Sequence, residues 1–146
     1  MALYLAYGMN TNIEQMAYRC PSAISYGRYD IPDHRLVFRG VADAVYSPGD
    51  ILQCVLWDIT SNCEEALDML EGFPYFYDKK EVEVEFMGIK DYAMMYYMVN
   101  PYNTSHPNYS YQEMLEEGYY VHGLDLEQIY QAEGFNKYES IYSSGL

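Results

Sequence analysis

The 146-residue sequence predicts an α+β fold, a small mixed β-barrel with inserted and C-terminal helices. The first observation is a series of short apolar or alternating segments separated by Gly, Pro and Asp turns, a pattern typical of strands. The second is a set of segments with helical spacing of apolar residues, placed between and after those strands. The third is length, which suits one hydrophobic core. We therefore expect one domain over residues 1–146, with a tail from about residue 134.

The first predicted elements are a buried strand over residues 3–7 and a short helix that ends at Tyr18. Gly8 stops the apolar run, and the stretch "TNIE" that begins at Thr11 fits a capping box. A strand that turns through a glycine into a helix presents backbone N–H groups to a ligand above the strand. The alternative is a simple tight turn, since the loop lacks the full pattern of a dinucleotide site or a P-loop.

The middle of the chain predicts further strands at 23–29, 35–39, 42–46 and 52–59, with turns at "IPDH" and "SPGD". A second capping box, "SNCE", opens a helix at Ser61 that runs to about Leu70, and Gly72 stands where a C′ glycine ends a helix. Strands at 79–87 and 92–99 then pair across "GIKD", and helices follow at 111–119 and 125–133.

Charge and composition exclude several classes of function. The net charge is −14, and the eight Lys and Arg residues are scattered, so we expect no nucleic-acid partner. No apolar run reaches the roughly 18 residues that span a bilayer, and no signal peptide is evident, so we expect no membrane partner. The number of cysteines is odd and no two form a CxxC pair: they are Cys20, Cys54 and Cys63. This pattern predicts reduced, buried thiols and a cytoplasmic protein. His106 and His122 lack metal-ligand spacing, so we expect no metal and no cofactor.

Glu71 is the candidate for proton-transfer chemistry. It lies at the last turn of the helix that begins at Ser61, next to the apolar residues Leu67 and Leu70. Burial and the negative end of a helix dipole both raise the pKa of a carboxyl group, as a general base near neutral pH requires. An exposed glutamate at a frayed helix end remains the alternative.

An ordered set of stretches resembles the γ-glutamylcyclotransferase-like family, in the compact "YGMNTN" version found in bacterial and phage genomes. These stretches are "YLAYGMN", "MAYRCPSA", "GVADAVYSPGDILQCVLWDIT", "ALDMLEGFPYFYDKKEVEV" and "YSYQEMLEEGYYVHGL", which together cover roughly residues 2 to 130. The resemblance implies a pocket at the mouth of a small barrel. It also implies that Glu71 is the catalytic acid/base, and that substrate is bound by Tyr7, Gly8, Met9, Asn10, Tyr77 and Tyr111. Met9 departs from the usual serine, and Asp78 stands where many relatives carry a basic residue.

The resemblance implies a γ-glutamyl amine cyclotransferase that releases 5-oxoproline and a free amine without a metal or cofactor. The expected partner is a small molecule with a γ-glutamyl or amino-acid-like group. One alternative is a pocket protein that binds a small ligand without this reaction, such as a phage sponge for a host signalling molecule acting in the host cytoplasm. A second is an interaction protein with a vestigial pocket. Mass spectrometry of a ligand after incubation separates the enzyme from the pocket protein: a changed mass indicates turnover, and an unchanged ligand indicates sequestration.

Overall fold

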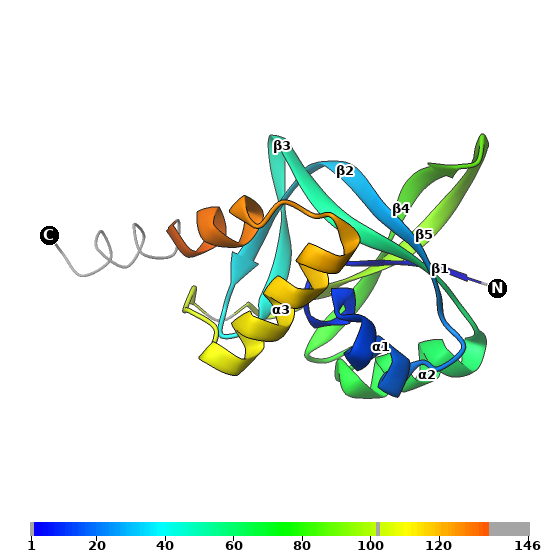
Figure 1. The fold of residues 1–146 in the computed structure, drawn as a ribbon, viewed down its shortest axis with the longest axis horizontal. Helices are drawn as coiled ribbons and strands as arrows, with labels where there is room; N and C mark the ends of the chain where they lie inside the picture. The colour runs from blue at the N-terminus through cyan, green and yellow to red at the C-terminus, as the bar shows by residue number, and fades with distance from the viewer. Residues whose placement is uncertain (1, 102, 135–146) are drawn as a thin grey trace, which may run out of the picture.

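The computed structural model describes residues 2–101 and 103–134, so the predicted tail beyond residue 134 lies outside the described residues (Figure 1). The strands are β1 (Ala2–Ala6), β2 (Ile24–Phe38), β3 (Ala42–Ile59), β4 (Tyr77–Phe86) and β5 (Ile89–Met98). The helices are a 3-10 turn η1 (Met9–Thr11), α1 (Ile13–Arg19), α2 (Ser61–Leu70) and α3 (Tyr109–His122), and residues 127–134 are also helical. This mixture confirms the predicted α+β class.

The strands form one sheet in the order β2-β3-β1-β5-β4. The short strand β1 is central, antiparallel to β3 from Ala2↔Ile59 to Ala6↔Val55 and parallel to β5 at Leu3↔Ala93. A central strand is covered on both faces, which explains its uninterrupted apolar sequence. The chain leaves β1 directly into residues 7–10, which we call the glycine loop. This loop is therefore attached to the most enclosed strand of the sheet.

The two edges of the sheet, β2 and β4, approach each other through side chains although no backbone ladder joins them. Three contacts link these strands: stacked Tyr26 and Phe86 rings with centroids 4.4 Å apart, the Glu85 N–H donating to Tyr29 Oη at 2.7 Å, and Lys80 Nζ at 2.6 Å from His34 Nε2. Edges of one sheet can meet only if the sheet curls. The sheet is therefore barrel-like in shape, with a seam of side chains where a closed barrel has hydrogen bonds.

The predicted turns at "IPDH" and "SPGD" do not end strands, which corrects the four short strands expected there. Residues 24–38 and 42–59 form two long paired strands, and the register jumps from Pro32↔Ile51 to His34↔Tyr46. At this irregularity Asp33 has a φ of 61°, and its Oδ1 accepts the N–H of Gly49 at 2.9 Å. Turn-forming residues therefore produce a bulge, because the ladder on either side continues the pairing.

Both predicted helix caps are displaced by one residue. Asn12 caps α1 by accepting the N–H of Gln15, and Thr60 caps α2 by accepting the N–H of Cys63. The Thr11 hydroxyl instead donates to the carbonyl of Gly8 at 2.8 Å and stabilises the preceding loop. At its other end, α2 finishes as predicted, with Gly72 in the left-handed conformation at a φ of 64°.

Helix α3 packs against the loop that follows β1, and Gly118 permits the close approach. A Cβ atom at Gly118 would lie 2.4 Å from Thr11 Oγ1 and 2.6 Å from the Thr11 carbonyl carbon. Two hydrogen bonds reinforce the contact: the Asn12 amide donates to the Met114 carbonyl at 2.8 Å, and the Tyr119 hydroxyl donates to the Tyr7 carbonyl at 2.8 Å. Among the described residues, no helix has the length and apolar character to cross a bilayer.

The cysteines correct the prediction of three reduced thiols. Cys20 and Cys63 form a disulfide with a Cα–Cα distance of 5.2 Å, whereas Cys54 is free and buried. The bond joins the end of α1 to the first turn of α2, two helices that lie side by side in Figure 1. The pairing was not evident because the two residues are 43 positions apart and only the fold brings them together.

We expect the double variant Cys20→Ala/Cys63→Ala to lose about 2–4 kcal/mol in the free energy of unfolding, since the bond closes a long loop in the unfolded chain. Urea denaturation with and without a thiol reductant measures the effect. The reductant should lower the midpoint of the wild type and leave that of the double variant unchanged. Equal wild-type midpoints under both conditions would contradict a stabilising disulfide.

Candidate active site

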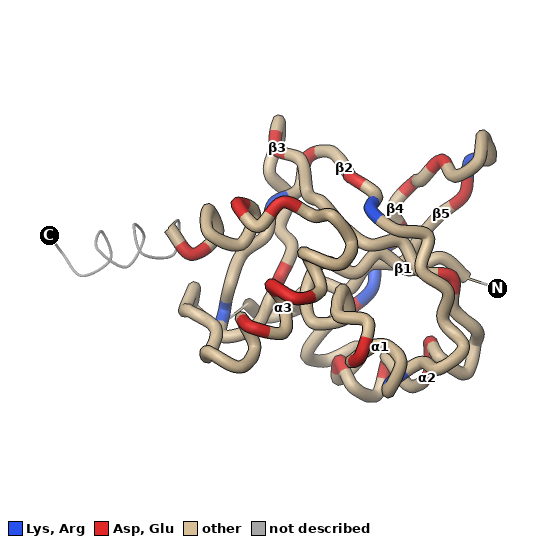
Figure 2. The backbone as a smooth tube through the Cα atoms, in the orientation of Figure 1, with Lys and Arg blue, Asp and Glu red and all other residues tan. Residues whose placement is uncertain are grey.

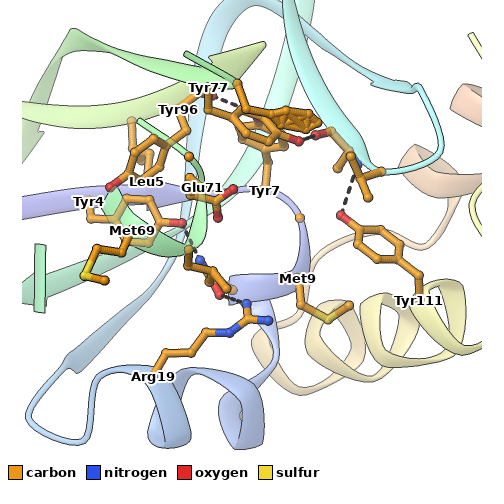
Figure 3. A pocket seen from close by; sticks show the side chains of 17 residues that line it. Tyr4, Leu5, Tyr7, Met9, Arg19, Met69, Glu71, Tyr77, Tyr96 and Tyr111 are labelled. Carbon is orange, nitrogen blue, oxygen red and sulfur yellow. Dashed lines mark hydrogen bonds between the residues drawn. The ribbon is translucent and has the colours of Figure 1, made fainter. Parts of the chain in front are cut away.

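A cavity of about 420 Å³ lies beside the C-terminal end of β1. Residues of η1 and the last residue of α1 line it on one part of its wall, and the end of α2 and the first residues of β3 and β4 line it on another. Tyr111 of α3 completes the lining. Figure 3 shows the side chains that line the cavity. All of the predicted site residues line this single cavity: Tyr7, Gly8, Met9, Asn10, Glu71, Tyr77 and Tyr111. They come from four separate parts of the chain, which the sheet and α3 bring together.

The glycine loop owes its shape to close packing and not to a left-handed conformation. Gly8 has a φ of −112°, which lies outside the left-handed region. A Cβ atom there would lie 3.0 Å from Ala42 Cβ and 3.2 Å from Tyr111 Oη. Glycine is therefore needed because β3 and α3 leave no room for a side chain at this point.

Tyrosine hydroxyls fix the backbone around the loop. Tyr111 Oη accepts the N–H of Ala42 at 3.0 Å and is also hydrogen-bonded to the backbone of Met9. Tyr77 Oη donates to the Ala42 carbonyl at 2.6 Å, and Tyr7 Oη donates to the Tyr96 carbonyl at 2.7 Å. Among the described residues the Tyr111 hydroxyl proton has no acceptor. Burial raises the pKa of Tyr111 to about 12, so this phenol keeps its proton at neutral pH and can donate it to a ligand oxygen.

The segment that carries Ala42 is itself fixed by a buried carboxylate. Asp43 is 2% exposed, and its oxygens accept from the Arg39 guanidinium at 3.0 Å and from the Met98 N–H at 2.9 Å. A buried carboxylate that is paired and hydrogen-bonded is a structural group. Asp43 thus ties the start of β3 to the end of β5 and holds one wall of the cavity.

Glu71 occupies the C-cap of α2, and its carboxylate points into the cavity (Figure 3). Its backbone N–H donates to the Leu67 carbonyl at 2.8 Å, and its carbonyl accepts the N–H of Tyr77 at 3.2 Å. The carboxylate has no hydrogen-bond partner among the described residues. Burial raises the pKa of Glu71 to about 7, and the charge of Arg19 opposes this shift. The partly buried position contradicts the alternative of an exposed glutamate at a frayed helix end.

An ion-pair network fixes α2 on β4. Lys79 Nζ, on β4, lies 2.7 Å from Glu64 Oε2 and 3.0 Å from Asp68 Oδ2, both on α2. The other oxygen of Asp68 accepts the hydroxyl of Tyr96, a cavity residue, at 2.6 Å. The helix that ends at Glu71 is therefore held at its middle by groups that also orient the cavity wall.

Asn10 braces the site with its side chain. It is 3% exposed; its amide nitrogen donates to Tyr4 Oη at 2.9 Å and its amide oxygen accepts from Arg19 Nη1 at 2.5 Å. Trp57 Nε1 donates to its carbonyl at 3.0 Å. Asn10 therefore holds the side chains of Tyr4 and Arg19 in place at the cavity.

A family model described as "Gamma-glutamyl cyclotransferase, AIG2-like" matches residues 4–122. The chain belongs to this family of enzymes. Gamma-glutamylcyclotransferase from Bos taurus is 30% identical over 138 residues, covering 86% of this chain and 73% of the bovine protein, and the Homo sapiens protein is 29% identical with the same coverage. A solved structure titled gamma-glutamyl cyclotransferase matches with a TM-score of 0.78 at 27% identity, over 90% of this chain and 86% of that one. A protein from Pyrococcus horikoshii shares the fold, with a TM-score of 0.57 at 18% identity.

In this cyclotransferase family member, sequence reasoning missed several cavity residues. They are Tyr4, Leu5, Arg19, Val41, Ala42, Met69, Leu70, Gly72, Phe76 and Tyr96. Arg19 had a detectable signal, because it is the only basic residue of the first helix and precedes the "CPSA" break. The described residues bring no three His, Cys, Asp or Glu side chains together as a possible metal site.

We expect Gly8→Val to weaken ligand binding at least about tenfold, because the added side chain must displace Ala42 or Tyr111 and move the loop. Gly134→Val is the matched control, since a Cβ atom there meets nothing within 4 Å. Calorimetric titration with a γ-glutamyl amine measures the affinities, and circular dichroism checks that both variants fold. Wild-type affinity in a folded Gly8→Val protein would contradict the role given to this loop.

Proposed function

We propose that the chain is a γ-glutamyl amine cyclotransferase that converts its substrate to 5-oxoproline and a free amine, with Glu71 as general acid and base. The observation that carries the proposal is the carboxylate of Glu71, which points into the cavity, has no hydrogen-bond partner among the described residues, and has a pKa near 7. Family membership and the gamma-glutamylcyclotransferase relatives support the same reaction class.

The proposed reaction begins with the α-amine of the substrate. An ammonium group has no lone pair, so Glu71 first takes a proton from it. The amine then attacks the γ-carbonyl carbon and forms a five-membered ring with a tetrahedral oxyanion. As the C–N bond to the amine half breaks, protonated Glu71 returns its proton to the departing nitrogen. The ring nitrogen still carries two protons after its attack; it gives one of them to Glu71, which passes it to the released amine, so that a neutral lactam ring and an ammonium group leave. A carboxyl group with a pKa near 7 suits both steps, because neither protonation state is costly at neutral pH.

The oxyanion requires donors at the glycine loop. The Tyr111 hydroxyl supports this assignment, because it stays protonated and its proton has no acceptor among the described residues. Gly8 and Asn10 also line the cavity, so we propose their backbone N–H groups as the remaining donors. Donors fixed before the reaction stabilise developing charge without reorganising, and each one typically contributes about 10²–10³-fold in rate.

The amine half of the substrate meets a mainly apolar wall. Met69 and Leu70 are 85% and 49% exposed, and Met9 also lines the cavity. Methionine adapts its shape to different partners. This wall supports recognition of the amine half by contact area and not by charge.

We expect Glu71→Gln to lower kcat by about 10²–10⁴-fold, because glutamine keeps the shape of the side chain but cannot accept the proton. Binding should change less than turnover. Product formation and ligand affinity are measured on the same protein, with Glu65→Gln, an exposed position on α2, as the control. Near-normal turnover by Glu71→Gln would overturn the mechanism. If the wild type binds γ-glutamyl amines without converting them, the sequestration hypothesis replaces the enzyme.

We also expect Glu71→Gln to stabilise the fold at high pH. The folded pKa of about 7 exceeds the ordinary value of 4.5, so the folded state binds this proton more tightly. The wild type should therefore lose stability relative to the variant as pH rises from about 4.5 to 7, by up to roughly 3 kcal/mol. Thermal unfolding at pH 4 and pH 8 measures the difference. A gain at pH 4 equal to that at pH 8 would contradict a raised pKa, and Glu65→Gln should show no pH-dependent gain.

A further inference from the structure

A second cavity, of about 190 Å³, lies at the N-terminal end of β1 and shares no lining residue with the first cavity, which contains Glu71. Each of the five strands contributes to its lining, which includes Leu3, Tyr26, Asp58, Phe86, Ile89 and Asp91. Alternate residues of a strand point to the same face, so Leu3 in the second cavity and Leu5 in the first lie on one face of β1. The two cavities therefore lie toward opposite ends of the space that the curled sheet encloses.

The second cavity contains a buried carboxylate without a cationic partner. Asp58 is 5% exposed, and its Oδ2 accepts the hydroxyl of Tyr26 at 2.7 Å. Among the described residues its other oxygen has no hydrogen-bond donor, and no Lys or Arg forms an ion pair with it. Asp43, the other buried aspartate, has the Arg39 guanidinium instead. A buried carboxylate is costly unless it is paired, so Asp58 leaves a negative charge to be matched at this cavity.

A second carboxylate lines the same cavity and is also without an ion pair. Asp91 Oδ1 accepts the N–H of Tyr92 at 2.8 Å, and no Lys or Arg of the described residues pairs with it. The neighbouring Lys90 lies on the opposite face of β5, where it is the ladder partner of Glu85. The described lining of the cavity thus holds two acidic side chains, Asp58 and Asp91, and no basic one.

The rest of the lining is mainly apolar. The rings of Tyr26 and Phe86 stack with centroids 4.4 Å apart, and Leu3 and Ile89 add aliphatic surface. A metal ion of the calcium or magnesium type requires several oxygen ligands, and the described residues bring no three His, Cys, Asp or Glu side chains together. The cavity is smaller than those that hold drug-sized molecules. Its chemistry therefore suits a small cation that carries an apolar body.

The charge of the whole chain favours the same class of ligand. The net charge is −14, and acidic residues are spread over the helices and over β4 and β5 (Figure 2). This field attracts cations and repels anions. We propose that the second cavity binds a small organic ammonium ion, with its charged group at Asp58 and Asp91 and its apolar body against Phe86 and Ile89. This inference does not depend on the proposed function.

The probes n-butylammonium and butan-1-ol test the proposal, because they share a carbon chain and differ in the charged group. Titration calorimetry on the full chain should show that the ammonium ion binds about 10–100-fold more tightly than the alcohol, the range of a hydrogen bond to a charged group. Asp58→Asn keeps an acceptor for the Tyr26 hydroxyl but removes the charge, so this preference should fall at least about tenfold. Asp91→Asn should lower it less, because Asp91 is exposed.

Two control variants locate the bound cation. Glu83→Gln removes one charge from an exposed position of β4 outside the second cavity, and Glu71→Gln removes the carboxylate of the first cavity. Both should keep the wild-type preference. Equal losses in Glu83→Gln and Asp58→Asn would assign the preference to the overall charge, and a loss in Glu71→Gln alone would place the cation in the first cavity. Either result overturns the proposal.

The wild type and the exposed variant keep the proposal falsifiable if Asp58→Asn does not fold, which circular dichroism checks. In that case a lowered preference in Asp91→Asn supports the site, and an unchanged preference overturns it. Equal affinities of the wild type for n-butylammonium and butan-1-ol, or no saturable binding of n-butylammonium, would also overturn the proposal. None of these measurements involves turnover, so their outcome is separate from that of the enzyme hypothesis.

Discussion

The contact between α3 and the loop after β1 is the constraint on which the site depends. Without a side chain at Gly118, the helix lies against Thr11 and Asn12, and its Tyr119 hydroxyl reaches the carbonyl of Tyr7. Elements more than 100 residues apart in sequence are thereby joined at backbone level. The same helix then delivers Tyr111 to the other side of the loop. One small residue therefore sets both the position of the glycine loop and the wall opposite it.

Placing the carboxylate of Glu71 at the end of α2 is unfavourable for the folded state. Burial disfavours the ionised form of Glu71, and the charge of Arg19 offsets only part of this effect. Glu71 is also the C-cap of α2, where the helix dipole does not favour a negative charge. A structural carboxylate avoids the cost with partners, as Asp43 does through Arg39 and the Met98 N–H. The carboxylate of Glu71 is partly buried without such hydrogen-bond partners among the described residues. This combination is typical of residues that act in chemistry. The disulfide and the Lys79 network hold α2 in place despite this unfavourable group.

The unusual number of tyrosines, 19 in the chain, has a partial explanation in this arrangement. Tyr7, Tyr77 and Tyr111 each place a ring in the cavity wall and use the hydroxyl to satisfy a backbone group. A phenylalanine would fill the same space but would leave a carbonyl or N–H without a partner in a region of low dielectric constant. The hydroxyls therefore make an apolar wall compatible with irregular backbone around the cavity.

The sequence by itself determined the fold class, the helix that ends at Glu71 and the residues of the glycine loop, because apolar periodicity, the Gly72 stop and ordered family stretches are local properties of the chain. It did not determine that β2 and β3 run unbroken through their bulge, since pairing partners decide whether turn residues end a strand. The Cys20–Cys63 bond and the placement of Arg19 beside Asn10 were also beyond local reasoning. Each depends on which helices become neighbours, and only the curled sheet and the packing of α3 decide that. Gly8 shows both levels: its position was evident from the apolar run, whereas the reason for glycine there is the approach of Ala42 and Tyr111.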